Sequence, residues 1–182
     1  TFINKDKGYF RQGSQMLWID RSAKDWKIKE GITLDKDAEN TEGFSDNNGF
    51  AYTIKNNLYL NKNGKVTQIT NDSDEDIVNG QAVHQREFGI TKGIFISPDN
   101  SKIAFYKMDQ SMVADYPIID WSITPAANKN IKYPMAGTLS HHVKLGIYDI
   151  KTNKTTILNI EGDPEQYLTV ITWNPDSKSV FV

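Results

Sequence analysis

Three ionisable side chains, His84, Arg86 and Glu87, lie within one short polar turn, VHQREFG at residues 83–89. A carboxylate at such a place accepts charge-assisted hydrogen bonds from a cationic group, and these bonds strengthen where the surroundings are partly dry. The alternative is a solvated connection between two strands that binds nothing. The residue types by themselves leave both interpretations open.

An acidic run just before this turn has a spacing that suggests calcium. Asp72, Asp74 and Asp76 match the opening of a calcium-binding loop. However, Ile77 stands where that loop needs a glycine, and Val83 stands where it needs a glutamate. A solvated acidic turn is therefore the better interpretation.

Residues for other chemistry are few. His141 and His142 are adjacent, and neighbours on a strand point to opposite faces, so both cannot easily ligate one ion. Cysteine is absent, which excludes thiolate sites. No G-x-S-x-G nucleophile motif occurs, since Ser45 in GFSDN lacks the second glycine. We expect no metal, no cofactor and no catalytic residue in this chain.

Composition excludes two further classes of function. The formal net charge is -2, so no basic surface for nucleic acid is expected. No window reaches the roughly 18 apolar residues of a membrane span, and no signal peptide is visible. The chain opens on TFINKDKGYF and stops on the apolar alternation KSVFV, which suggests a piece of a longer protein.

Alternating apolar and polar residues recur along the chain, and helical spacing is almost absent, so we predict an all-β fold. A turn followed by an apolar strand occurs three times, at FSDNNGFAYT, FISPDNSKIAFYK and TWNPDSKSVFV. The second and third copies align without a gap at a spacing of 77 positions, from Pro98 to Pro175. The first copy aligns with one indel.

A β-hairpin also occurs three times, from Met16, Leu58 and Leu145, with turn residues that tolerate left-handed backbone. A turn, strand and hairpin together make one four-stranded antiparallel sheet, and such sheets bury their faces only against neighbours in a ring. We predict about three blades of a larger β-propeller, in one partial domain over 1–182. The blade units lie near 8–32, 43–71, 93–160 and 165–182.

Two segments interrupt the repeat. One is 75–91, which contains the ionisable turn and where we expect a short helical turn near 82–88. The other is a long insertion, 109–139, which is richer in apolar residues than a solvated loop would be. It either projects as an arm or folds back over its own blade.

The ordered series HQREFG, FISPDNSKIAFYKMDQSMVADYP, YPMAG and VKLGIYD resembles a known propeller. It is similar to the N-terminal propeller of dipeptidyl peptidase IV and its bacterial relatives, in the prolyl oligopeptidase family of serine peptidases. The resemblance runs from about Gly8 to Val182. In that family the propeller caps an α/β-hydrolase domain that carries the Ser-Asp-His triad. We therefore expect the catalytic domain to be absent from this chain, which alone should be inactive.

The resemblance also implies a substrate-binding site. In the family, a glutamate pair on a short propeller helix holds the ammonium of the peptide N-terminus. Glu87 falls on the second glutamate, whereas Arg86 occupies the position of the first, which departs from the family's pattern. Arg11 is the candidate for an arginine that contacts the substrate carbonyl, with a surface arginine on a loop as the alternative.

The insertion resembles the arm that crosses the two-fold axis of family dimers. Its exposed apolar residues suit a contact between identical subunits. The residues expected in that contact are Tyr116, Ile118, Ile119 and Trp121.

The expected function is that of a non-catalytic propeller, which gates the substrate and recognises its N-terminus. The parent would be a serine exopeptidase that releases dipeptides after proline or alanine, in the periplasm, at the cell surface or secreted. Its partners would be a peptide with a free N-terminus, the C-terminal hydrolase domain and a second copy of the chain. Two alternatives stay open: a protein-binding scaffold, and the propeller cap of a related endopeptidase or acylaminoacyl-peptidase.

Overall fold

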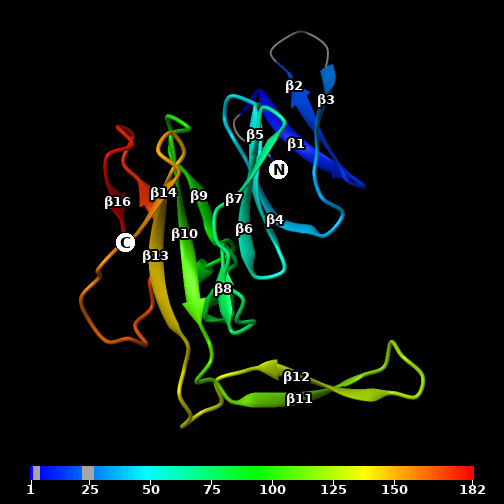
Figure 1. Ribbon diagram of the computed structural model, residues 1–182, viewed down its shortest axis with the longest axis vertical. Helices are drawn as coiled ribbons and strands as arrows, with labels where there is room; N and C mark the ends of the chain where they lie inside the picture. The colour runs from blue at the N-terminus through cyan, green and yellow to red at the C-terminus, as the bar shows by residue number, and fades with distance from the viewer. Residues whose placement is uncertain (2–4, 22–26) are drawn as a thin grey trace.

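The computed structural model describes residues 1, 5–21 and 27–182 of the chain. Its strands form three successive antiparallel sheets, a separate hairpin and the start of one more sheet (Figure 1). This confirms the predicted all-β fold built from antiparallel blades. Residues 22–26 of the first predicted blade unit lie outside the described residues.

The first two sheets come directly after one another in the chain, and each is a simple up-and-down meander. The second has the four strands predicted for a blade, and it begins one strand before the turn at Phe44. Their strands are β1 (Lys7–Gln12), β2 (Gln15–Asp20) and β3 (Lys27–Thr33), then β4 (Ala38–Gly43), β5 (Gly49–Ile54), β6 (Asn57–Lys62) and β7 (Lys65–Gln68).

The third sheet has the order β14-β13-β10-β8, with β9 also paired to β10. Its two central strands, β10 and β13, are antiparallel over their whole length. The strands of this sheet are β8 (Ile77–Asn79), β9 (Ile94–Ile96), β10 (Lys102–Asp109), β13 (His142–Asp149) and β14 (Lys154–Ile157); β15 (Thr172–Trp173) and β16 (Val180–Phe181) begin the next.

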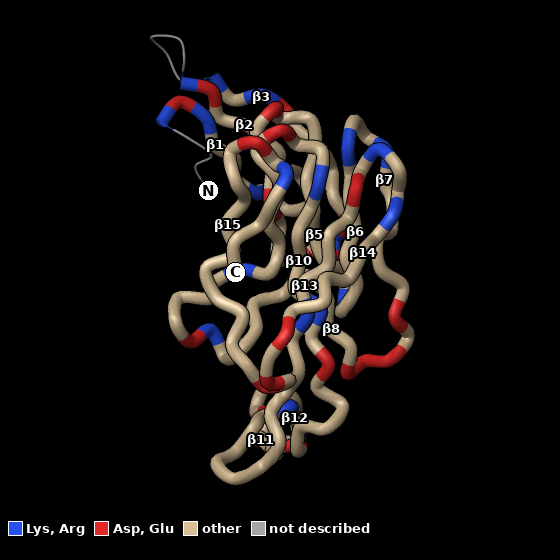
Figure 2. The backbone as a smooth tube through the Cα atoms, turned by 90° about the vertical axis from the view of Figure 1, so that its left-hand side faces the viewer, with Lys and Arg blue, Asp and Glu red and all other residues tan. Residues whose placement is uncertain are grey.

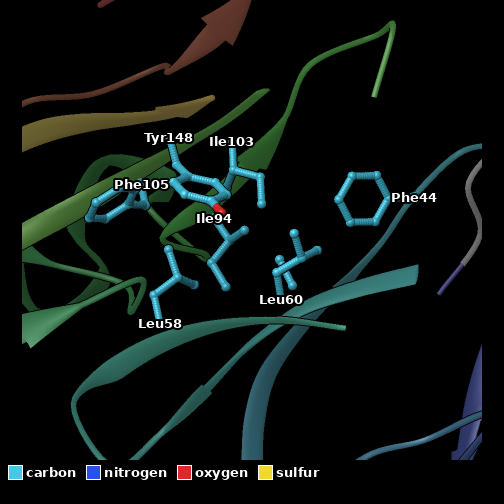
Figure 3. Packing of buried hydrophobic residues seen from close by; sticks show 8 residues of the cluster. Phe44, Leu58, Leu60, Ile94, Ile103, Phe105 and Tyr148 are labelled. Carbon is cyan, nitrogen blue, oxygen red and sulfur yellow. The ribbon is translucent and has the colours of Figure 1, made fainter. Parts of the chain in front are cut away.

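Each pair of successive sheets encloses one hydrophobic cluster, because side chains alternate between the two faces of every central strand. In β10, Ile103 and Phe105 pack toward the second sheet, whereas Ala104 and Tyr106 pack toward the β15-β16 side. Figure 3 shows the cluster between the second and third sheets, to which the second contributes Leu58 and Leu60 and the third contributes Ile103 and Phe105. Burying each large apolar side chain contributes roughly 1.5–3 kcal/mol.

The three turns of the repeat have the same hydrogen bond. The backbone N–H of Phe44 donates to Gly49, that of Ser97 to Lys102, and that of Asn174 to Ser179, at 3.0, 2.9 and 2.9 Å. In each turn an aspartate accepts from the backbone N–H two residues later. All three copies therefore form the same kind of turn, and the first copy needs no indel within it.

Neighbouring turns also bind one another across the blade boundary. The side-chain amide of Asn100 donates to the hydroxyl of Ser45 at 2.9 Å. The backbone N–H of Asp99 donates to the hydroxyl of Ser177 at 3.1 Å. These contacts join the second sheet to the third, and the third sheet to the pair β15 and β16.

The expected helical turn lies at His84–Gly89, but its backbone is unusual. Gln85, Arg86 and Phe88 have φ values of 50°, 65° and 50°, in the left-handed region, while Glu87 is extended. Side-chain-bearing residues seldom adopt left-handed backbone. The surrounding contacts must therefore hold this turn in place.

The insertion forms an arm made of β11 (Asp115–Asp120) and β12 (Ala127–Lys132). Figures 1 and 2, at right angles to each other, both place this hairpin beyond one end of the third sheet. The arm projects and does not fold back over its own blade. Within the described ranges, no helix has the length and apolar character to cross a membrane.

Candidate functional site

The turn at 84–89 rests on a pair of buried histidines. His84 is only 2% exposed and His141 only 3%. The backbone N–H of His84 donates to Nε2 of His141 at 3.2 Å, so this nitrogen is an acceptor. Nδ1 of His84 lies 3.1 Å from the same nitrogen and is therefore the protonated one. Both rings fit as neutral imidazoles.

Burial also favours the neutral form of both rings. Burial, and to a smaller degree the neighbouring His141, lowers the pKa of His84 to about 4, while Glu87 opposes the change. Burial likewise lowers the pKa of His141. At neutral pH both histidine rings are therefore uncharged. They hold the turn through the hydrogen bond that the backbone N–H of His84 donates to His141.

Glu87 lies at the exposed edge of this support. One of its carboxylate oxygens, Oε2, accepts a hydrogen bond of 2.8 Å from the hydroxyl of Tyr167. The Tyr167 ring stacks on His84 with centroids 4.2 Å apart, and Phe88 meets its edge at 5.2 Å. An exposed carboxylate beside two aromatic rings is suited to bind a cation.

Tyr167 is itself held by its neighbours in the loop between β14 and β15. Leu168 is buried, and its carbonyl accepts a 2.7 Å hydrogen bond from the hydroxyl of Tyr106. Burial raises the pKa of Tyr106 to about 12, so this donor keeps its proton. Glu165 accepts from the backbone N–H of Ser140 at 2.7 Å, which ties the loop to the segment carrying His141.

Arg86 lies in different surroundings from Glu87. It lines a cavity of about 230 Å³ at the base of the arm, together with His84, Gln110 and Lys132. Glu87 is not among the lining residues. Arg86 and Glu87, although adjacent in sequence, thus lie on different parts of the surface.

Arg11 lies on β1, in the first sheet. Its guanidinium donates to the carbonyls of Gly13 at 2.7 Å, Lys36 at 3.2 Å and Ala38. These bonds tie the first hairpin to the connection between β3 and β4. No contact within 5–21 and 27–182 joins Arg11 to Glu87, and its role toward a substrate carbonyl stays a prediction.

The acidic run is occupied by protein contacts. Both oxygens of Asp72 accept from Lys107, at 2.7 and 2.8 Å. Asp74 accepts from the backbone N–H of Asp76 at 2.9 Å. In the part of the chain that the structure describes, no group of three histidine or acidic side chains is placed to hold a metal.

The arm carries its predicted contact residues in the open. Tyr116 and Ile118 are 44% and 38% exposed, and Ile119 and Trp121 are 54% and 78% exposed. Apolar side chains are unfavourable in water. A large patch of exposed apolar side chains therefore usually marks an interaction site. The geometry suits a contact with another protein surface.

Tyr167 and His141 were not predicted as parts of the Glu87 site. Tyr167 is 80 positions from Glu87, and His141 is 57 positions from His84. Tyr167 belongs to no motif, and the adjacent histidines suggested only a weak metal site. The only local signal was His84 itself, beside the turn.

The stacked antiparallel sheets define this chain as part of a β-propeller. The Glu87 carboxylate, held by Tyr167, makes the turn at 84–89 a candidate cation-binding site. The family model of the dipeptidyl peptidase IV N-terminal region matches residues 2–182. The chain belongs to this family.

Individual relatives agree with this family. A putative dipeptidyl aminopeptidase IV from Bacteroides ovatus is 40% identical, with a TM-score of 0.79, over 97% of this chain and 24% of that one. Dipeptidyl peptidase 4 of Porphyromonas gingivalis, 21% identical with a TM-score of 0.74, has the same fold over 97% of this chain and 26% of its own.

Curated relatives include a probable dipeptidyl-aminopeptidase B of Pyrenophora tritici-repentis, 30% identical over 96% of this chain and 22% of its own. Another, from Talaromyces marneffei, is 32% identical over 70% of this chain and 16% of its own. The chain therefore spans about a sixth to a quarter of the length of these relatives.

Proposed function

We propose that this chain is the propeller part of a serine exopeptidase of the dipeptidyl peptidase IV type, and that it recognises the free N-terminus of the peptide substrate. Glu87 binds the substrate's ammonium group. One observation carries this proposal: Glu87 is exposed, yet its carboxylate is held at 2.8 Å by Tyr167 on a turn supported by buried histidines. A solvated connection needs no such support.

The chemistry of the anchor explains selection for a chain end. A charge-assisted hydrogen bond forms between the carboxylate and a terminal ammonium. An internal segment of a peptide offers no positive charge there, so its binding leaves the carboxylate desolvated and unpaired. Two extended residues span roughly 7 Å, which would set the bond to be cut at a fixed distance from the anchor.

Catalysis belongs to a separate hydrolase domain in this proposal. Acyl transfer needs an activated serine, a general base and an oxyanion hole. The propeller contributes the orientation of the substrate, and we propose cleavage after proline or alanine by resemblance to the family. The parent protein would accordingly release dipeptides, while this chain alone would release none.

The first test compares Gly-Pro-p-nitroanilide with its N-acetylated form in the full-length protein. We expect Glu87→Gln to raise KM for the free-amine substrate at least about tenfold, because a hydrogen bond between charged groups is lost. The rate with the acetylated substrate, which has no ammonium, should stay low and unchanged. Glu39→Gln, on the exposed part of β4, is the matched control and should behave as wild type.

Three results would contradict the proposal. An unchanged KM in Glu87→Gln would show that Glu87 does not bind the ammonium of the substrate. Equal cleavage of free and acetylated substrates favours the propeller cap of an endopeptidase or acylaminoacyl-peptidase. Cleavage of neither substrate favours a protein-binding scaffold.

We also propose that the arm of β11 and β12 joins two copies of the parent protein. Its exposed apolar residues, named above, give it a surface that a second copy would cover. A contact between identical copies repeats each pair of residues across the two-fold axis.

A further inference from the structure

We propose that Tyr167 is a second residue of the amine anchor, whose hydroxyl donates to Glu87 and accepts a hydrogen bond from the substrate's ammonium. This inference rests on the proposed function of Glu87. It adds a binding group from a different part of the chain, the loop between β14 and β15, 80 positions away.

The direction of the hydrogen bond follows from the two partners. An ionised carboxylate has no proton to donate, so the phenol is the donor in the 2.8 Å contact. The same hydrogen bond to Glu87 raises the pKa of Tyr167, which keeps the phenol protonated. The lone pairs of the hydroxyl oxygen stay available as acceptors.

An ammonium group needs more acceptors than one carboxylate oxygen. It carries three N–H donors, and Oε2 of Glu87 already accepts from Tyr167. Because Oε2 and the Tyr167 hydroxyl oxygen are 2.8 Å apart, one nitrogen can lie within hydrogen-bond distance of both. The tyrosine is 46% exposed, so a ligand can reach this oxygen.

The ring of Tyr167 is placed before any ligand arrives. It stacks on His84 at 4.2 Å with an angle of 24°, and Phe88 packs on its edge at 84°. The His84 ring is in turn held by His141, whose Nε2 lies 3.1 Å from Nδ1 of His84. A group that is fixed in advance loses little conformational freedom when it binds, which strengthens binding.

The test uses the full-length protein and Tyr167→Phe, which keeps both ring contacts and removes only the hydroxyl. We expect KM for Gly-Pro-p-nitroanilide to rise about tenfold with kcat within about twofold, as for one hydrogen bond to a charged group. The rate with the acetylated substrate should not change. The matched control is Tyr148→Phe, which removes a 2.8 Å hydroxyl bond to Asn153 in another turn and should leave KM unchanged.

A second variant separates donation from acceptance. Tyr167→Trp keeps an aromatic ring and an N–H donor but offers no acceptor. We expect it to raise KM as well. A wild-type KM in this variant would show that no acceptor is needed and would overturn the inference.

The outcomes also distinguish this inference from the proposed function. If Glu87→Gln raises KM and Tyr167→Phe does not, Glu87 is the anchor and Tyr167 is no part of it. If Glu87→Gln changes nothing, both ideas fall. If Tyr167→Phe impairs both substrates equally or lowers kcat, its role is structural and the inference is wrong.

Discussion

At the scale of residues, the position of Glu87 depends on side chains that never meet the solvent. His84 and His141 are buried, and their mutual hydrogen bond places the turn that carries Glu87. Burying polar rings is unfavourable unless they find partners. Nε2 of His84 is buried and has no hydrogen-bond partner among the described residues. Its burial is therefore unfavourable, and the hydrogen bond between the two histidines offsets part of this free energy.

This arrangement predicts a pH dependence of stability. The folded pKa of His84, about 4, lies below its ordinary value of 6.5, so the unfolded chain binds the proton more readily. The free energy of unfolding should therefore be highest above about pH 7 and decline as the pH falls toward 4. We expect a loss of about 2 kcal/mol from this group between pH 7 and 5.

Urea unfolding of wild type and His84→Gln at pH 7, 6 and 5 measures this effect. The variant should be less stable at pH 7 but should lose less stability on acidification. Asn159→Gln, at an exposed residue without a titratable side chain, is the control and should keep the wild-type slope. Equal slopes in wild type and His84→Gln would contradict the prediction.

At the scale of elements, the arm differs from every other hairpin. The central strands of the second and third sheets, β5 and β10, are largely buried, whereas β11 and β12 pair only with each other and are exposed at nearly every residue. Figure 2 shows the arm at the lower end of the molecule, apart from the charged blade turns at the other end. A two-stranded hairpin alone is marginally stable in water, so a partner surface would stabilise it.

The proposed dimer contact predicts the effect of a charge on the arm. Ile119→Glu places a carboxylate in the centre of an apolar interface, and we expect the dimer dissociation constant of the full-length protein to rise at least about tenfold. Analytical ultracentrifugation measures this change. Ile28→Glu, at an isoleucine of β3 that is 64% exposed, is the control and should leave the association unchanged.

A dimer that persists in Ile119→Glu would place the interface elsewhere. A wild-type protein that is monomeric at all concentrations would remove the arm's proposed role.

At the scale of the whole molecule, stability resides between the blades. Phe105 of the third sheet is completely buried in the cluster that it shares with Leu58 and Leu60 of the second (Figure 3). Gly146, its neighbour on β13, leaves room for the ring, since a Cβ there would lie 2.5 Å from Phe105. Because the cluster contains side chains of both sheets, we expect the two sheets to unfold together.

Removing that ring should therefore destabilise both sheets together. We expect Phe105→Ala to lower the free energy of unfolding by about 3–5 kcal/mol, because a cavity is left between the sheets. Phe181→Ala, at a phenylalanine that is 61% exposed, should cost less than about 0.5 kcal/mol. Urea unfolding followed by tryptophan fluorescence compares the two, and similar costs would contradict this account.

The blades could be predicted because their signals are local. Alternation of apolar residues encodes strands of period two, and Asp46, Asp99 and Asp176 mark the same turn in three copies. The stacking of the blades could also be predicted, because the apolar face of each sheet must be covered by a neighbouring sheet. Even the turn around Glu87 was recognisable, because its residue types are contiguous.

The surroundings of Glu87 could not be predicted in the same way. The hydroxyl of Tyr167 and the ring of His141 reach the turn from segments far away in the chain, through loops whose paths depend on how blades pack. The separate surroundings of Arg86 likewise depend on where the arm leaves the third sheet. By itself, the sequence determined the sheets, their turns and the family, since these depend on near neighbours. Only the tertiary structure decided which side chains meet at Glu87, because contacts between distant segments depend on the packing of the whole chain.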